Sequence, residues 1–252
     1  MPSTLHPLTS LTAAGCTAVI TTAAGLWPLS LAVALAASVL AWRAGVGRRV
    51  LAAGAAVLLP LGLSLLMLHG LFFPEGRIVL AAWGPARVTA EGLGFALDAG
   101  TRTGACVLVL LLFTFTVSAP DLVAALAAKG LPPQFGFVLA SALTLLPAMA
   151  GRLAAIRAAQ EARGLVVGGG MVSRFAAVRV QMIPLVLGLI EDSGHRAQAL
   201  DARGFGRPGP RTAYRELADP PVERRCRAAL LLLAAAAVAL RLAASWPAAG
   251  LP

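Results

Sequence analysis

Long uncharged runs of apolar residues alternate with short polar segments along this chain. Residues 7–41, 50–74 and 103–119 carry no Asp, Glu, Lys or Arg, and in a last run, 228–242, Arg241 is the one charged side chain. About 20 apolar residues in a helix cross the hydrocarbon core of a bilayer. The pattern therefore predicts an all-α, polytopic membrane protein with about five transmembrane helices.

The first run allows two arrangements. Residues 7–41 are long enough for one tilted span or for a hairpin of two short helices, with Gly25 and Pro28 at the turn. Residues 50–74 predict a transmembrane helix despite Pro60, and residues 103–119 predict the return span.

Charge in the polar segments predicts the orientation. Residues 43–49 hold three Arg, residues 75–100 hold two bases against three acids, and residues 120–227 hold fourteen bases against eight acids. Since cytoplasmic loops are enriched in Lys and Arg, the first and last of these segments are predicted to be cytoplasmic. The last run then crosses outward, with Arg241 reaching the far interface. This describes a multi-pass protein of the bacterial cytoplasmic membrane.

Three regions follow from this topology: membrane spans over 1–119, a cytoplasmic domain of amphipathic coupling helices over 120–227, and a C-terminal span over 228–252. The uncharged stretch 135–151 is also apolar enough for a span. A span there would place the basic residues 152–227 outside. We therefore favour a helix that packs on the membrane domain or lies at the interface.

The cytoplasmic region is predicted to be helical. Turn residues bound a short helix within 118–133, and longer helices are expected over 135–163 and 173–203. Each long helix contains a proline, Pro147 or Pro184, and each ends in Ala-Arg-Gly. This is a weak two-fold internal repeat.

An apolar stripe on the third helix predicts a helical partner. Its members recur at three-four spacing, opposite Arg174, Arg179 and Gln181. They are Phe175, Val178, Met182, Leu185 and Leu189. Two solvated ion pairs are also expected between residues four apart, Arg157 with Glu161 and Asp192 with Arg196.

The repeated tripeptide occurs in the words AQEARGL, residues 159–165, and AQALDARGFG, residues 197–206. A single copy fits an ordinary helix end, because Gly accepts the left-handed conformation and Arg interacts favourably with the last carbonyls. Two copies at two helix tips favour a further role. A guanidinium there can meet a partner's carboxylate with directional hydrogen bonds.

With these words, the start Leu5–Thr9 and the arrangement of spans, the chain resembles the transmembrane T component, EcfT/CbiQ type, of energy-coupling factor (ECF) vitamin and metal importers. The resemblance implies that Arg163 docks on one ATP-binding cassette ATPase subunit and Arg203 on another. It also implies that four small residues shape the two tips. They are Ala162, Gly164, Ala202 and Gly204.

In that family a separate membrane subunit, the S component, captures the substrate. The resemblance therefore implies an energy-coupling scaffold between two ATPases and an S component, for uptake of a vitamin or a transition-metal ion. It does not specify which compound is transported, whether the module is dedicated or shared, or whether the two ATPases are identical.

Nucleotide, metal and catalytic sites are not expected in this chain. It has no GxxxxGK[ST] motif, so ATP is expected to be used by the partner ATPases, with no cofactor bound here. The glycines at 204, 206 and 209 spell GxGxxG but follow a helix, unlike a dinucleotide fingerprint. Three His and three Cys are scattered without metal-ligand spacing.

Composition fits a membrane protein that is not an enzyme. The chain is 58% hydrophobic, with mean hydropathy +0.82 and net charge +10. We assign the basic excess to membrane orientation and expect no nucleic-acid partner. Two alternatives are an autonomous transporter or channel, and a membrane-embedded lipid-processing enzyme. Both need convergent polar residues within the spans, where Pro60 and His69 are isolated candidates.

Overall fold

The computed structural model describes residues 6–70, 78–83, 86–164, 170–207 and 219–245. The chain forms two compact units. We call Met1–Ala125 with Leu217–Pro252 the bundle unit, and Leu126–Glu216 the paired-helix unit. The described residues are almost entirely helical, which confirms the predicted all-α class.

The first apolar run is a hairpin of two helices. Helix α1 covers Pro7–Ala24 and α2 covers Trp27–Arg43. Gly25 ends α1 in the left-handed conformation, with φ 61°, and Pro28 lies in the first turn of α2. Of the two arrangements that the sequence allows for residues 7–41, the structure therefore has the second.

The remaining elements of the bundle unit bring a small β-hairpin that the sequence did not predict. Helix α3, Gly47–Leu65, continues as the π-helical turn η1, Leu66–Gly70, where the ring of His69 stacks on Phe95 with centroids 4.7 Å apart. Strand β1, Val79–Trp83, then pairs antiparallel with β2, Ala86–Thr89.

Helix α4, Ala90–Thr116, begins thirteen residues earlier than the uncharged run that predicted it. Thr89 caps it by accepting a hydrogen bond from Gly92 N at 3.2 Å, and Glu91 accepts from Ile78 N. Asp98 forms an ion pair with Arg102 one turn later. Capping and a pair at i, i+4 thus stabilise a helix through a segment whose polarity suggested a loop.

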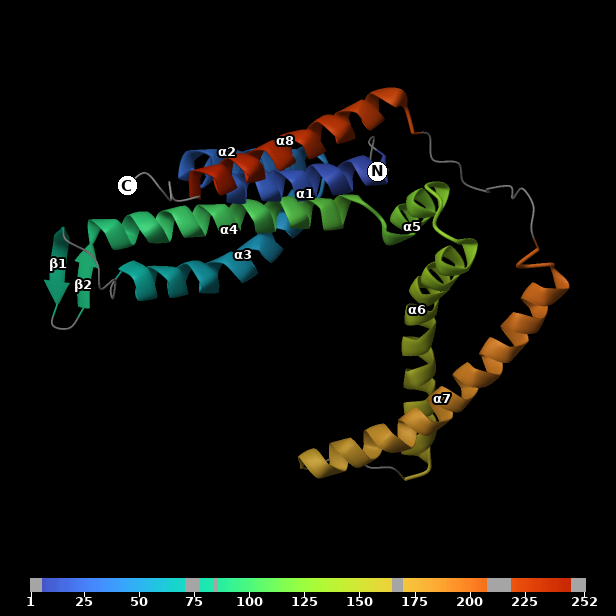
Figure 1. Ribbon diagram of the computed structural model, residues 1–252. Helices are drawn as coiled ribbons and strands as arrows, with labels where there is room; N and C mark the ends of the chain where they lie inside the picture. Colours follow the sequence, from blue (N-terminus) through green and yellow to red (C-terminus); the bar gives the residue numbers. More distant parts are fainter. Residues whose placement is uncertain (1–5, 71–77, 84–85, 165–169, 208–218, 246–252) are drawn as a thin grey trace, which may run out of the picture. The chain divides into compact units, whose positions relative to one another are not determined.

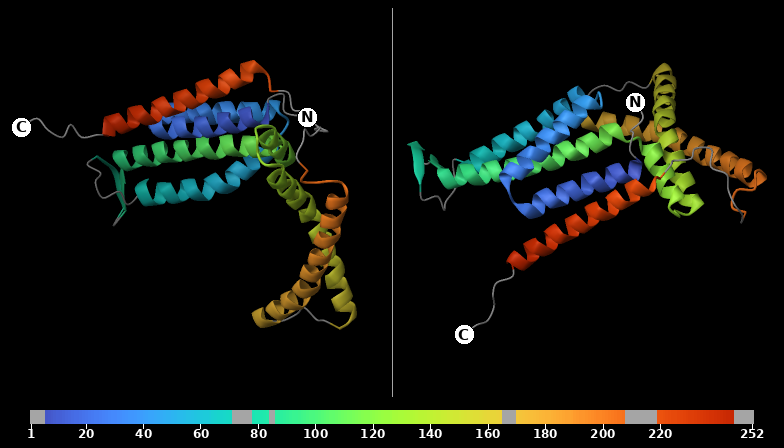
Figure 2. Two further views of the ribbon diagram at one scale, coloured as in Figure 1. Left: turned by 45° about the vertical axis from the view of Figure 1, so that its right-hand side comes forward. Right: turned by 90° about the horizontal axis from the view of Figure 1, so that it is seen from above.

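Small residues let the bundle helices approach closely. A methyl group at Gly54 of α3 would lie 3.0 Å from Leu108 Cδ2 of α4, and Cys106 Sγ of α4 lies 3.7 Å from Thr22 Oγ1 of α1. Helix α4 contacts α1, α2 and α3, while α8, Pro221–Ser245, packs along α1 (Figures 1 and 2). This is the packing expected of membrane helices.

A buried polar group, which we call the N-terminal cluster, joins the start of α1 to the start of α8. Arg227 Nη2 donates to both carboxylate oxygens of Asp219 at 2.7 and 2.8 Å, and Nη1 donates to Thr9 Oγ1 at 3.1 Å. Glu223 accepts from Thr9 Oγ1 at 2.6 Å and from His6 N at 3.0 Å. The cluster fixes the register between α1 and α8.

Four helices are long and apolar enough to cross a membrane within the described residues. They are Gly47–Gly70, Ala90–Thr116, Gln134–Ala162 and Pro221–Ala244. Trp27–Arg43 and Ala119–Ala128 are shorter apolar helices. The third of the four includes the stretch 135–151 that we assigned to the cytoplasmic region, so its length and composition also suit a span.

Candidate functional site

The paired-helix unit holds both Ala-Arg-Gly tips. Helix α5, Ala119–Ala128, leads into α6, Pro133–Ala162, and α7 covers Met171–Ala202. These bounds agree with the three helices predicted for residues 118–203, and Pro147 and Pro184 lie inside α6 and α7 as expected. The two long helices cross one another (Figures 1 and 2).

Contacts at two levels show that α6 and α7 run antiparallel. Near the start of α6, the ring of Phe137 lies 5.1 Å from the ring of Phe205, which follows the end of α7. Halfway along, Arg152 of α6 forms an ion pair with Asp192 of α7. Gly188 leaves room for this arginine, whose Nη1 would lie 3.8 Å from a methyl group there.

One of the two predicted ion pairs is present and the other is replaced. Arg157 Nε donates to Glu161 Oε1 at 2.8 Å along α6, as expected. Asp192 was expected to pair with Arg196 on its own helix, but the ion pair that it forms is with Arg152 across the crossing. The acid therefore contributes to helix association rather than to one helix alone.

The buried face of α7 differs from the predicted stripe. Among the residues of α7 whose side chains are described, Ala177, Gln181 and Leu185 are buried, and they recur every four residues. Leu185 belongs to the predicted stripe, but Phe175 is 81% exposed, and Val178 and Met182 are exposed too, so a helical partner for these three stays a prediction. A close crossing favours a small residue such as Ala177 over Phe175.

The first tip follows α6. Arg163 N donates to Gln160 O at 3.1 Å, and Gly164 N donates to Glu161 O at 3.0 Å. Gly164 has φ 90°, in the region that favours glycine, and a methyl group there would meet no atom within 4 Å. The side chains of Ala162 and Arg163 are exposed. The backbone thus turns sharply and leaves the guanidinium at the end of the helix.

The second tip follows α7 and has a complete Schellman motif. Phe205 N donates to Leu200 O at 2.9 Å and Gly204 N donates to Asp201 O at 2.9 Å, with φ 69° at Gly204. Arg207 folds back, so that its Cδ would lie 3.2 Å from a methyl group at Gly204. Ala202 and Arg203 are exposed, as at the first tip.

The two tips lie at opposite ends of the helix pair. Phe205, beside the second tip, contacts Phe137 in the second turn of α6, whereas Arg163 directly follows the last turn of α6. Helix α6 has 30 residues. The two arginines are therefore roughly 30–40 Å apart along the helix pair.

Each tip presents a cation that can bind a carboxylate. Among the described residues, neither the Arg163 nor the Arg203 side chain has an ion pair or a side-chain hydrogen bond. A guanidinium offers five N–H donors in a rigid plane and can hold a carboxylate with two of them. Each exposed guanidinium can therefore bind a carboxylate group.

Two features of the site were not anticipated from the sequence. The Phe137–Phe205 contact fixes the second tip to the start of α6, and Arg207 adds a second cation there. Arg207 follows Arg203 by four residues in the word ARGFGR, so the sequence itself contains the signal for this second cation. The Phe–Phe contact joins residues far apart in the chain, so no local pattern indicates it.

The glycines that spell GxGxxG follow the end of a helix. Gly204 and Gly206 are left-handed, with φ 69° and 99°, and they follow a helix, while position 209 lies outside the described residues. Within the described ranges, no group of three or more His, Cys, Asp or Glu is placed to hold a metal ion.

The chain is similar to a known family and to several known proteins. The family described as cobalt transport protein, CbiQ, matches residues 1–214. The energy-coupling factor transporter transmembrane protein EcfT of Leuconostoc gelidum subsp. gasicomitatum is 29% identical over 170 residues, 64% of this chain and 63% of that protein. EcfT of Staphylococcus aureus is 27% identical over 161 residues, 60% of each chain.

A third relative, EcfT of Limosilactobacillus fermentum, is 28% identical over 156 residues, 58% of each chain. The chain thus matches about three-fifths of the length of these relatives. The relatives are transporter membrane components, and four helices here suit membrane spans. Such helices are what a multi-pass membrane protein requires. Because the family match covers most of its length, the chain belongs to the CbiQ family of cobalt transport proteins.

Proposed function

We propose that the chain is the energy-coupling scaffold of an ECF-type ABC importer. It would join two cytoplasmic ATPase subunits, which use ATP, to a membrane subunit that binds a vitamin or a transition-metal ion. Arg163 docks on one ATPase subunit and Arg203 on the other, with Ala162, Gly164, Ala202 and Gly204 shaping the tips. The names of the three relatives, energy-coupling factor transporter proteins, support this proposal.

The observation that carries the proposal is the placement of the tips. Two exposed arginines, each set by a left-handed glycine, lie at opposite ends of one antiparallel helix pair. Each tip can then engage its own subunit. When the two subunits approach or separate, both helices are displaced, which is how motion would reach the membrane spans.

Exposed apolar surface on the same unit favours further partners. Phe135, Val138 and Leu146 of α6 are each more than 59% exposed, and so are Leu187 and Ile190 of α7. Large contiguous apolar surface is covered by lipid or protein in the functional state. We assign this surface to the membrane interface and to the S component.

Co-purification tests the docking role. The full chain, with Arg163→Glu plus Arg203→Glu, is expressed with its neighbouring ATPase pair and isolated in detergent. A charge-assisted hydrogen bond contributes about 1.5–3 kcal/mol, so reversing both charges is expected to reduce the retained ATPase more than about tenfold. The matched control is Arg48→Glu plus Arg225→Glu, the same charge change at two exposed arginines of the bundle unit.

The control is expected to retain the ATPases like the wild type. Equal retention by the tip variant, or no ATPase bound to the wild type, would show that Ala-Arg-Gly is only a helix end. Substrate uptake by this chain in cells that lack the ATPases would instead support an autonomous transporter.

A further inference from the structure

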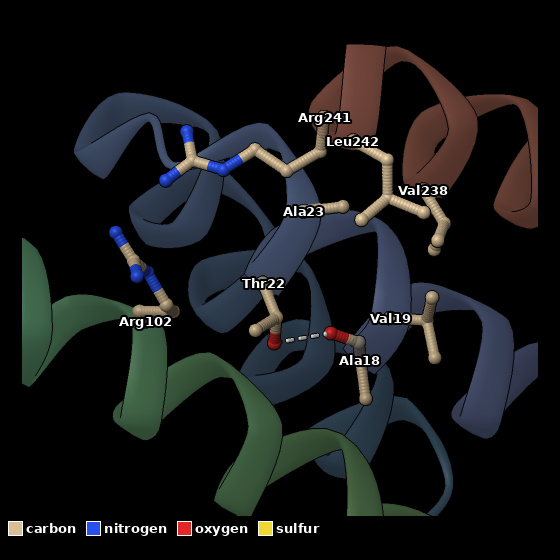
Figure 3. Close-up of a pocket in the computed structure, with 8 residues that line it drawn as sticks. All are labelled: Ala18, Val19, Thr22, Ala23, Arg102, Val238, Arg241 and Leu242. Atoms are coloured by element: carbon tan, nitrogen blue, oxygen red, sulfur yellow. Dashed lines mark hydrogen bonds between the residues drawn. The ribbon is translucent and has the colours of Figure 1, made fainter. Parts of the chain in front are cut away.

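An apolar groove with two arginines at its rim lies within the bundle unit. It has a volume of about 610 Å³ and opens between α1, α4 and α8 (Figure 3). Its wall comes mainly from Ala18, Val19, Ala23, Val238 and Leu242. Three of these side chains are exposed: Val19 at 43%, Val238 at 38% and Leu242 at 62%. The groove is therefore open on its apolar side.

Arg102 and Arg241 converge beside the turn between α1 and α2. A methyl group at Gly25 would lie 3.5 Å from Arg241 Nη1 and 3.7 Å from Arg102 Nη2. Figure 3 shows the two guanidinium groups on the same side of the groove, to the left of Thr22 and Ala23. Two like charges this close raise the electrostatic energy of the site unless an anion lies between them.

The charges at the rim are not balanced by the protein. Asp98 forms an ion pair with Arg102. Arg241 has no acidic partner within the described part of the chain, and Arg102 Nε is buried there without a hydrogen-bond partner. Asp98 Oδ1 is also buried without a hydrogen-bond partner. The rim therefore keeps one net positive charge, a free donor and a free acceptor beside an apolar wall, and its net charge favours the binding of an anion.

The depth of Arg241 favours a lipid as the source of that anion. On α8, Arg227 belongs to the N-terminal cluster near one end, and Arg241 lies near the other. The helix between them is about 21 Å long, shorter than the hydrocarbon core of about 30 Å. Arg241 therefore reaches the interface only by extending its side chain toward the headgroups, where a lipid phosphate can meet the guanidinium.

We propose that the groove binds an anionic phospholipid, with its phosphate between Arg102 and Arg241 and an acyl chain along Val19, Val238 and Leu242. The competing role for these arginines is to stabilise the carbonyl end of α1. Within the described residues, however, neither guanidinium donates a hydrogen bond to a backbone carbonyl of α1. The donors remain oriented for a ligand.

Lipid titration of the full chain in detergent, followed by native mass spectrometry, tests the proposal. Phosphatidylglycerol, phosphatidylcholine and inorganic phosphate are compared on the wild type, Arg241→Gln, Val238→Trp and Arg225→Gln. The last variant is the matched control, since Arg225 is an exposed arginine at the opposite end of α8. Val238→Trp fills the groove and leaves both arginines in place.

We expect one tightly held phosphatidylglycerol on the wild type and on Arg225→Gln. Its affinity should be about tenfold weaker in Arg241→Gln, since one charge-assisted contact is lost, and its binding should also be weakened in Val238→Trp. Equal retention of phosphatidylcholine would overturn the proposal, as would tight binding of inorganic phosphate without lipid, or unchanged phosphatidylglycerol binding in Arg241→Gln. ATPase co-purification is a separate readout, so this result is independent of the proposed docking at the tips.

Discussion

The two units of the molecule differ in how far they complete their own packing. The bundle unit buries Ala41, Val50 and Ala105 completely and holds the charged side chain of Arg227 in a closed polar cluster. In the paired-helix unit, three of the described residues are buried, and no residue of the most apolar stretch of α6 is among them. The bundle unit thus has a small buried core of its own, although both units expose large apolar side chains that lipid or other subunits can cover.

This difference indicates where stability and function lie. Polar groups of the N-terminal cluster are satisfied by each other, so their removal is costly. The paired-helix unit depends on a few exposed contacts, so substitutions there change the position of the tips more than they change folding. The following substitutions test this contrast, from the largest expected effect to the smallest.

Removal of Arg227 tests the bundle unit. Arg227→Met leaves the Asp219 carboxylate, 12% exposed, without its main partner. Loss of one member of a buried ion pair lowers the free energy of unfolding by about 3 kcal/mol, so a clear drop in melting temperature is expected in detergent. The double variant with Asp219→Asn should recover part of the loss. Wild-type stability of Arg227→Met alone would show that the N-terminal cluster is not structural.

Alanine at the tip glycines tests the paired-helix unit. Gly164→Ala and Gly204→Ala force a side chain into the left-handed region, at about 1–2 kcal/mol each. The change at Gly204 also displaces Arg207, so it should reduce ATPase retention more than the change at Gly164. Gly151→Ala in α6 is the control, since glycine inside a helix is destabilising by about 0.5–1 kcal/mol relative to alanine. Equal behaviour of all three variants would argue against a role for the left-handed turn.

The smallest effect is expected at the helix crossing. Arg152 and Asp192 are 46% and 37% exposed, and an exposed ion pair contributes about 0.2–1 kcal/mol. A double-mutant cycle with Arg152→Gln and Asp192→Asn should give a coupling free energy in this range, reduced by salt. A coupling free energy above about 2 kcal/mol lies well outside the range for exposed pairs. It would contradict the view that the paired-helix unit is held together by weaker contacts than the bundle unit.

Helix positions and tip geometry could be predicted from the sequence, because they depend on local chemistry. Uncharged runs, prolines and the glycine after each arginine determine where α6 and α7 begin and end. The early start of α4 could not be predicted from the sequence, because its polar first turns are stabilised by a cap at Thr89 and an ion pair at Asp98. Hydropathy does not report either contact.

The face of α7 that packs on α6 also could not be predicted. Two rows of residues at helical spacing competed, one with Phe175 and one with Ala177. The larger apolar row suggests burial, yet Phe175 is exposed while Ala177 and Gln181 are buried, and Leu185 belongs to both rows. Which row is used depends on the shape of the partner helix, and periodicity carries no information about that shape.

The Arg152–Asp192 ion pair at the crossing of α6 and α7 lies at equal distances from the two tips. Arg163 follows Arg152, and Arg203 follows Asp192, by the same eleven residues, so both arms measured from the ion pair are about 16 Å long. A rotation of either helix by about 10° about this ion pair would move its tip by about 3 Å. With arms of equal length, equal displacements of two docked subunits would turn the crossing without shifting its centre.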